Sequence, residues 1–141
     1  MNNLIIFHRV DYDGLFSCII TMKSIQDKKE SFEVLGWNYG DSIPEDKILD
    51  SFDRIYLVDL TLPKDIMIKY GKTGKLIWID HHITSIRDSE KYKYDNIFGL
   101  RDTTTAACLL CWKFFYGDKE PSKFLKLIAA YDIWDHESFS W

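Results

Sequence analysis

The sequence is poor in the residues that build disulfide frameworks and membrane spans. Its 141 residues include three cysteines, three prolines and seven glycines. The odd cysteine count and the lack of a signal-like start predict a protein of the reducing cytoplasm. Cys108 and Cys111 match a CxxC spacing, but without a second pair we interpret them as helical core residues. No apolar run approaches the length of a membrane span, which argues against a membrane partner.

Positive charge is also scarce. The chain has 18 Lys and Arg against 22 Asp and Glu, which gives a formal net charge of −4. This balance argues against binding of long duplex nucleic acid, which requires many phosphate contacts from basic side chains. It remains compatible with a small anionic substrate held by metal ions and a few local cations. The length and the 46% hydrophobic content indicate one globular domain with a substantial core.

Short apolar runs alternate with segments of helical periodicity along the chain. Strands are predicted at residues 4–7, 32–37, 55–58 and 76–79, with a weaker edge strand at 96–99. Helices are predicted at 15–29, 44–50 and 63–70, within a polar loop at 83–93, at 103–116 with the threonines 103–105 as its cap, and from Pro121. The order predicts an α/β fold in three layers, with a mostly parallel five-stranded sheet, helices on both faces and a helical C-terminal part. No repeat or linker interrupts residues 1–141, so we expect a single domain.

Acidic and imidazole side chains follow three of the predicted strands at the points where the strands end. In chain order they are His8 with Asp11 and Asp13, then Asp59, then Asp80 with His81 and His82. The carboxyl ends of parallel strands lie side by side, so these groups are expected to converge, and Asp132 lies where it can join them. So many like charges would not sit together without cations.

A mixed set of carboxylates and imidazoles favours particular metal ions. It suits Mn²⁺, Fe²⁺ or Mg²⁺ better than a structural Zn²⁺ site, in which thiolates are preferred. Two metal ions that share a carboxylate ligand can activate a water molecule and bind a phosphoryl group. Each residue taken alone has a simpler structural explanation, because a single aspartate after a strand more often stabilises a turn or caps a helix. Taken jointly, the residues favour a metal site.

These residues resemble the four motifs of the DHH phosphoesterase superfamily. The resemblance is carried by His8-x-x-Asp11-x-Asp13-Gly14, the strand-terminal Asp59, Asp80-His81-His82 and the later Asp132. It spans nearly the whole chain, in the superfamily's order. The opening motif looks closest to the nanoRNase and cyclic-nucleotide phosphodiesterase members. The pyrophosphatase branch is less similar, because Arg9 and Val10 stand where that branch typically has Asn-Pro.

The resemblance implies two divalent metal ions, with Mn²⁺ expected and Mg²⁺ or Fe²⁺ as alternatives. It implies that His8, Asp11 and Asp59 hold one ion. It implies that Asp13, Asp59, His81 and Asp132 hold the other, so that Asp59 bridges the two. Asp135 rivals Asp132 as the last ligand, since both lie in one short segment.

Further residues receive roles from the same resemblance and from their charge. His82 is expected to reach the scissile phosphate, and Asp80 is expected to orient a histidine from outside the ligand set. Together with the bridging Asp59, these two make up the predicted catalytic residues. Arg9 and Arg101 are expected to bind phosphate, from charge and position only.

The leading hypothesis is a cytoplasmic two-metal phosphodiesterase or phosphatase acting on a short nucleotide, such as nanoRNA or a cyclic or linear dinucleotide. Most members of the superfamily carry a second, C-terminal substrate-binding domain, for which these 141 residues leave no room. A homodimer or a partner domain would supply the missing part. One alternative is therefore a non-catalytic or half-length nucleotide- or metal-binding module. Others are a fragment of a RecJ-like exonuclease, or a flavodoxin-like structural domain with acidic loop ends and no metal.

Overall fold

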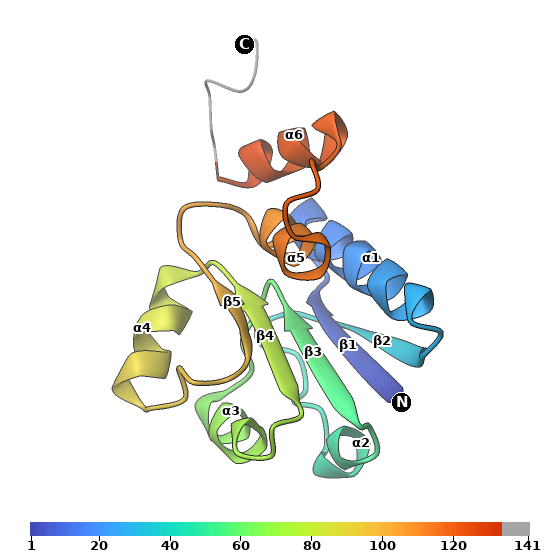
Figure 1. Cartoon of the computed structure of the whole chain (residues 1–141). Coiled ribbons are helices and arrows are strands. Elements are labelled where there is room, and N and C mark those ends of the chain that lie inside the picture. Colours follow the sequence, from blue (N-terminus) through green and yellow to red (C-terminus); the bar gives the residue numbers. More distant parts are fainter. Residues whose placement is uncertain (134–141) are drawn as a thin grey trace.

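The protein folds around one five-stranded sheet in which all described pairings are parallel (Figure 1). The structure is a computed structural model and describes residues 1–133. The strands are β1 (Asn2–His8), β2 (Ser31–Trp37), β3 (Arg54–Val58), β4 (Leu76–Asp80) and β5 (Gly99–Arg101). The helices are α1 (Tyr12–Asp27), α2 (Asp46–Asp50), α3 (Lys64–Gly71), α4 (Ile83–Lys91), α5 (Ala107–Tyr116) and α6 (Lys123–Asp132). The predicted α/β class is confirmed.

In the strand order β2-β1-β3-β4-β5, the side of the sheet on which new strands are added changes at β1. The chain passes from β1 to β2 on one side, and then crosses back to place β3 on the other side. In open α/β sheets, ligands bind in the crevice outside the carboxyl ends of the strands at such a switch point. Here that crevice lies beyond His8, the last residue of β1, and Asp59, which directly follows β3.

Two hydrophobic cores, one on each face of the sheet, make the fold three-layered. Alternate strand residues such as Ile6 and Leu57 share a buried cluster with side chains of α2 and α3. Their neighbours, such as Ile5, share a second buried cluster with side chains of α1, α5 and α6. Because successive side chains of a strand point to opposite faces, a continuous apolar run is buried on both sides. The prediction of helices on both faces is thus confirmed.

The cysteines belong to the second of these cores. Cys18, Cys108 and Cys111 are buried and carry free thiols. Cys108 and Cys111 lie on α5 and pack toward α1 and the sheet. The CxxC spacing therefore reflects helical core packing, as predicted.

The edge strand begins later than predicted. β5 covers Gly99–Arg101, whereas residues 96–99 were expected, and the side chain of Phe98 is exposed. Pairing starts at Gly99 because the chain passes very close to β4 at this point. A Cβ on Gly99 would lie 2.0 Å from the carbonyl oxygen of Trp78, and its φ of +147° favours glycine.

Several helices also differ from the predictions, among them α1, which begins at Tyr12 and not at residue 15. α5 begins at Ala107, with Ala106 as its N-cap, so the threonines 103–105 do not cap it. Instead, Asp102 accepts hydrogen bonds from the backbone N–H and the hydroxyl of Thr104 and holds a turn before the helix. α4 follows His82 directly and is longer than the short helix expected in that loop, while α2 starts two residues after Pro44.

Within residues 1–133, no helix is long and apolar enough to cross a membrane.

Candidate metal centre

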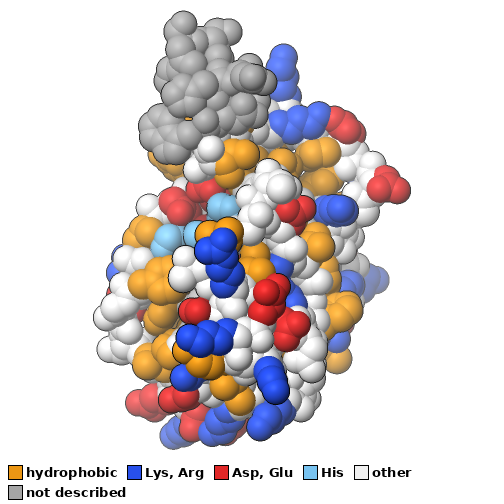
Figure 2. Space-filling model, turned by 90° about the vertical axis from the view of Figure 1, so that its left-hand side faces the viewer, with side chains coloured by type: hydrophobic (Ala, Val, Ile, Leu, Met, Phe, Trp, Pro, Cys, Tyr) orange, Lys and Arg blue, Asp and Glu red, His pale blue; other side chains and the backbone are white. Residues whose placement is uncertain are grey.

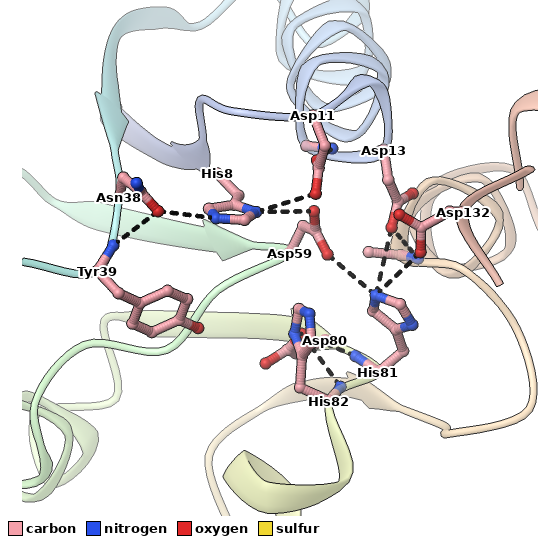
Figure 3. Close-up of polar contacts among 12 residues, drawn as sticks. His8, Asp11, Asp13, Asn38, Tyr39, Asp59, Asp80, His81, His82 and Asp132 are labelled. Carbon is pink, nitrogen blue, oxygen red and sulfur yellow. Dashed lines mark hydrogen bonds and ion pairs between the residues drawn. The ribbon is translucent and has the colours of Figure 1, made fainter.

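The predicted aspartates and histidines of the site come together at the carboxyl edge of the sheet (Figure 3). His8 and Asp80 end β1 and β4, and Asp59 follows β3. The beginning of α1 contributes Asp11 and Asp13, and the last residue of α6 is Asp132. Figure 2 shows histidine and acidic side chains exposed together on one face of the molecule, so solvent reaches the cluster. Asp135 lies outside the described residues.

The first group of potential ligands contains His8, Asp11 and Asp59. The Nδ1 atom of His8 lies 3.2 Å from Asp11 Oδ2 and 3.6 Å from Asp59 Oδ2. The other oxygen of Asp11, Oδ1, caps α1 by accepting the N–H of Gly14 at 2.7 Å. The capping bond fixes Asp11 so that its second oxygen faces the histidine.

The second group is centred on His81. Its Nε2 atom lies 3.1 Å from Asp59 Oδ1 and 3.3 Å from Asp13 Oδ2. The same atom lies 3.5 Å from Asp132 Oδ2. Asp59 therefore directs one carboxylate oxygen toward each group, the position expected of a bridging ligand.

The backbone of Asp59 adopts a conformation that non-glycine residues seldom use. Its φ is +61°, in the left-handed region, and its N–H donates to the carbonyl oxygen of Ile79 at 3.0 Å. Aspartate tolerates this region better than most residues, and such conformations concentrate at functional sites. The side chain is buried, and its Oδ2 has no hydrogen-bond partner among the described residues. A buried carboxylate oxygen without a donor is suited to a cation.

Asp13 links the cluster to the start of α5. Its carboxylate accepts the backbone N–H groups of Ala107 at 3.0 Å and of Cys108 at 2.7 Å. Ala106, the N-cap of α5, has no side chain that can accept these hydrogen bonds, so Asp13 acts as the cap from α1. The same carboxylate faces His81, so α5 is positioned directly against the candidate centre.

Asp80 orients the second histidine of the pair. Its Oδ1 lies 2.6 Å from Nδ1 of His82 and accepts the backbone N–H of His81 at 2.8 Å. With Nδ1 held by the carboxylate, Nε2 is the ring atom of His82 that remains for a ligand. Asp80 is fully buried and its Oδ2 has no described hydrogen-bond partner. It also belongs to a group with Asp59, His81 and His82 that has metal-binding geometry.

The many carboxylates of the cluster shift the pKa values of two of its histidines and two of its aspartates. The hydrogen bond with Asp11 and the adjacent carboxylate of Asp59 raise the pKa of His8 to about 10. Burial lowers the pKa of His81, but its contacts with Asp59 and the charge of Asp13 outweigh burial and raise that pKa to about 9. Burial, together with neighbouring carboxylates, raises the pKa of Asp13 and of Asp132 to about 6. Protons thus offset negative charge where metal ions would do so.

The two predicted phosphate-binding arginines both have partners within the chain. Arg9 makes two hydrogen bonds of 3.0 Å to Asp41 and is half-exposed. The guanidinium of Arg101 donates to the carbonyl oxygens of Trp78 at 3.1 Å and of Asp95 at 2.7 Å. It also lies 4.7 Å from the ring of Trp78. The described hydrogen bonds of Arg101 therefore attach it to β4 and its neighbouring loop, and none joins it to the cluster.

Two residues that follow β2 contact the site but were not among the predicted site residues. The side-chain oxygen of Asn38 lies 3.1 Å from Nε2 of His8. The ring of Tyr39 packs edge-on against the imidazole of His8, with 5.7 Å between ring centres. Since His8 pairs with Trp37 across the sheet, the rule that strand ends converge also applies to β2 and could have identified both residues.

Fold and site together define a class, an α/β domain with an aspartate–histidine cluster at its topological switch point. The cluster combines oxygen and imidazole donors. Asp59 belongs to two of the three potential ligand groups and contacts His81 of the third. No protein-family model matches the sequence, and a search of curated proteins finds no match either. The functional argument therefore rests on the residues and their geometry.

Proposed function

We propose that this protein is a two-metal-ion phosphoesterase of the DHH type that hydrolyses an ester of a short nucleotide. One observation carries the proposal, namely that distant segments of the chain bring two ligand groups together around a shared carboxylate, Asp59. A structural domain with acidic loop ends has no need for buried carboxylate oxygens without donors, as found at Asp59 and Asp80.

The donor atoms fit two hard divalent cations. His8, Asp11 and Asp59 would hold one ion, and Asp13, Asp59, His81 and Asp132 would hold the other. Carboxylate oxygens with imidazole nitrogens suit Mn²⁺, with Mg²⁺ or Fe²⁺ as alternatives. When bound, such ions supply activation of water and neutralisation of charge on the phosphoryl group.

His82 is the side chain best placed to contact the phosphoryl group from outside the two ligand groups. Its hydrogen bond with Asp80 raises its pKa, so the ring readily carries a proton at Nε2. A protonated Nε2 can donate to a phosphoryl oxygen and stabilise developing charge. Asp80 fixes the direction of this donor through Nδ1.

A cavity beside the cluster supports a nucleotide as the substrate. It has a volume of about 530 Å³, within the range of small-molecule sites. Asp11, Asp13 and Asp132 border it. Its other walls are mainly apolar or aromatic, formed by Phe7, Val10, Tyr12, Leu15, Ile128 and Tyr131, with Arg9 at the rim. Apolar and aromatic walls beside a phosphate-binding centre suit an ester that carries a flat base better than inorganic pyrophosphate.

Removing one aromatic wall tests this substrate assignment. Tyr12→Ala is expected to raise KM for a linear dinucleotide by about tenfold, within the range for loss of base stacking, with little change in kcat. Tyr12 is 62% exposed, so the fold is expected to tolerate the change. Phe98→Ala removes another exposed aromatic ring, near β5, and serves as the control. Equal KM values for all three proteins in steady-state assays would exclude Tyr12 from base recognition.

Metal binding is expected to depend on pH. In the metal-free protein at neutral pH, both rings carry an extra proton, because the pKa values of His8 and His81 are raised to about 10 and about 9. Ligation needs a bare nitrogen, so binding releases these protons. Mn²⁺ affinity is therefore expected to rise from about pH 6.5 to pH 8, about tenfold per pH unit for each proton released. Calorimetric titrations across this range measure it, and a pH-independent dissociation constant would exclude both histidines as ligands.

The proposed activity is tested by hydrolysis of bis-p-nitrophenyl phosphate and of a labelled linear dinucleotide with added Mn²⁺. We expect turnover of both, loss of turnover in EDTA and recovery when Mn²⁺ is restored. Metal binding without turnover of either substrate would contradict the enzyme and favour a half-length binding module that needs a partner domain. The three buried, free cysteines support our placement of this activity in the cytoplasm.

A further inference from the structure

The imidazole of His8 is held from both sides (Figure 3). Its Nδ1 faces the carboxylates of Asp11 and Asp59. Its Nε2, on the opposite side of the ring, lies 3.1 Å from the side-chain oxygen of Asn38. Only one of these sides faces the potential ligands, so His8 can bind an ion there only if Nδ1 is the nitrogen that loses its hydrogen.

The orientation of the Asn38 amide is fixed by an independent contact. The backbone N–H of Tyr39 donates to Oδ1 of Asn38 at 2.9 Å. A backbone N–H needs an acceptor, so this position must hold the amide oxygen and not the amide nitrogen. The same oxygen faces His8. Because an amide oxygen only accepts hydrogen bonds, Nε2 of His8 must be the donor.

The loop that carries Asn38 is attached to the residue that follows His8. The N–H of Asn38 donates to Asp41 Oδ2 at 2.8 Å, and Asp41 also accepts two hydrogen bonds from Arg9. The backbone N–H of Arg9 in turn donates to the carbonyl oxygen of Trp37 at 3.1 Å. These bonds connect the ends of β1 and β2, so Asn38 and His8 keep a fixed separation. Arg9 thus has a supporting role in this loop, in addition to its place at the cavity rim.

We infer that Asn38 is a positioning residue that holds one ring hydrogen of His8 on Nε2, so that Nδ1 is the nitrogen that loses its hydrogen and binds a metal ion. The inference rests on the metal centre of the proposed function but not on its catalytic activity. Metal-bound histidines generally donate their second ring N–H to a neighbouring oxygen, and loss of that oxygen weakens metal binding by about 10- to 100-fold. Asn38 occupies this place for His8.

The tautomer can be read directly from the unmodified protein. In protein with ¹⁵N-labelled histidine and saturating Mg²⁺, a diamagnetic ion, long-range ¹⁵N–¹H correlation spectra identify which nitrogen carries the hydrogen. We expect the hydrogen of His8 on Nε2. A hydrogen on Nδ1 in the loaded wild type would overturn the inference, whatever any variant does.

Two substitutions of Asn38 separate the acceptor from the bulk of the side chain. Asn38→Asp keeps an oxygen for both His8 and Tyr39, and is expected to preserve the Nε2–H tautomer with Mn²⁺ affinity at least equal to that of wild type. Asn38→Leu removes the acceptor, so either ring nitrogen can keep the hydrogen when the other loses it, and Mn²⁺ binding is expected to weaken by about 10- to 100-fold. Asn96→Leu, the same change at an exposed position, is the control.

The outcomes distinguish this inference from the proposed function. Unchanged Mn²⁺ affinity and a single Nε2–H tautomer in Asn38→Leu would overturn the inference while leaving the metal centre in place. A wild-type protein that binds no Mn²⁺ would instead overturn the metal centre itself. Metal binding with the expected tautomer but no hydrolysis would support the inference and contradict only the catalytic proposal.

Discussion

Asp59→Asn is expected to lower phosphoester hydrolysis by at least about a hundred-fold without unfolding the protein. Asp59 directs one oxygen toward His8 and the other toward His81, so the substitution weakens both proposed ion sites at once. Asparagine tolerates the left-handed φ of +61° at this position, so the backbone is expected to persist. The measurement is kcat/KM with saturating Mn²⁺, alongside the thermal unfolding midpoint.

Asp65→Asn provides the matched control, because it removes an equivalent charge from the first turn of α3, away from the cluster. Its activity is expected to equal that of wild type. If Asp59→Asn retained wild-type activity at every Mn²⁺ concentration, Asp59 would not bridge metal ions during the reaction. A folded variant without turnover would support the proposed role.

Gly14→Ala is expected to destabilise the fold strongly. A Cβ at Gly14 would lie 1.9 Å from the carbonyl oxygen of His8 and 2.9 Å from its Cβ. Both obstacles belong to the end of β1 and cannot rotate away as the tip of a long side chain would. We expect a loss of about 3 kcal/mol or more in the free energy of unfolding, at the upper end for overpacking. Urea unfolding followed by circular dichroism measures this loss.

Gly71→Ala is the informative comparison for this prediction. There an added Cβ meets only the side chain of Ile97, at 3.0 Å, and a side chain can shift. A smaller loss of stability is expected than at Gly14. If both variants unfolded at the same urea concentration as wild type, α1 would not approach β1 as closely as the structure shows. The close approach matters for function because it places Asp11 and Asp13 beside His8.

Local sequence signals were sufficient for the sheet and for most of the candidate site. Continuous apolar runs such as residues 4–7 and 55–58 indicate strands buried on both faces, and such strands are parallel. Parallel strands end at one edge, so the ionisable residues that follow them, such as His8 and Asp59, could be placed together from the sequence. The structure brings the six predicted metal ligands into neighbouring groups.

The features that the sequence did not reveal depend on contacts between distant segments. The threonines 103–105 look like a helix cap, but α5 receives its cap from Asp13, 94 residues from Ala107. The start of β5 depends on how closely Gly99 approaches Trp78, and the hydrophobic pattern of the sequence does not predict this contact. Asn38 resembles an ordinary turn residue until the pairing of β1 with β2 places it against His8. The roles of these residues follow from tertiary packing, not from local propensity.

The central claim, a two-ion centre that shares Asp59, is tested most directly by counting bound metal. Native mass spectrometry and calorimetric titration of the metal-free protein with Mn²⁺ give the stoichiometry and the affinities. We predict about two Mn²⁺ per chain for wild type and loss of at least one in Asp59→Asn. A wild-type protein that binds no Mn²⁺, Mg²⁺ or Fe²⁺ would contradict the claim, because the buried carboxylates would then be compensated by protons alone.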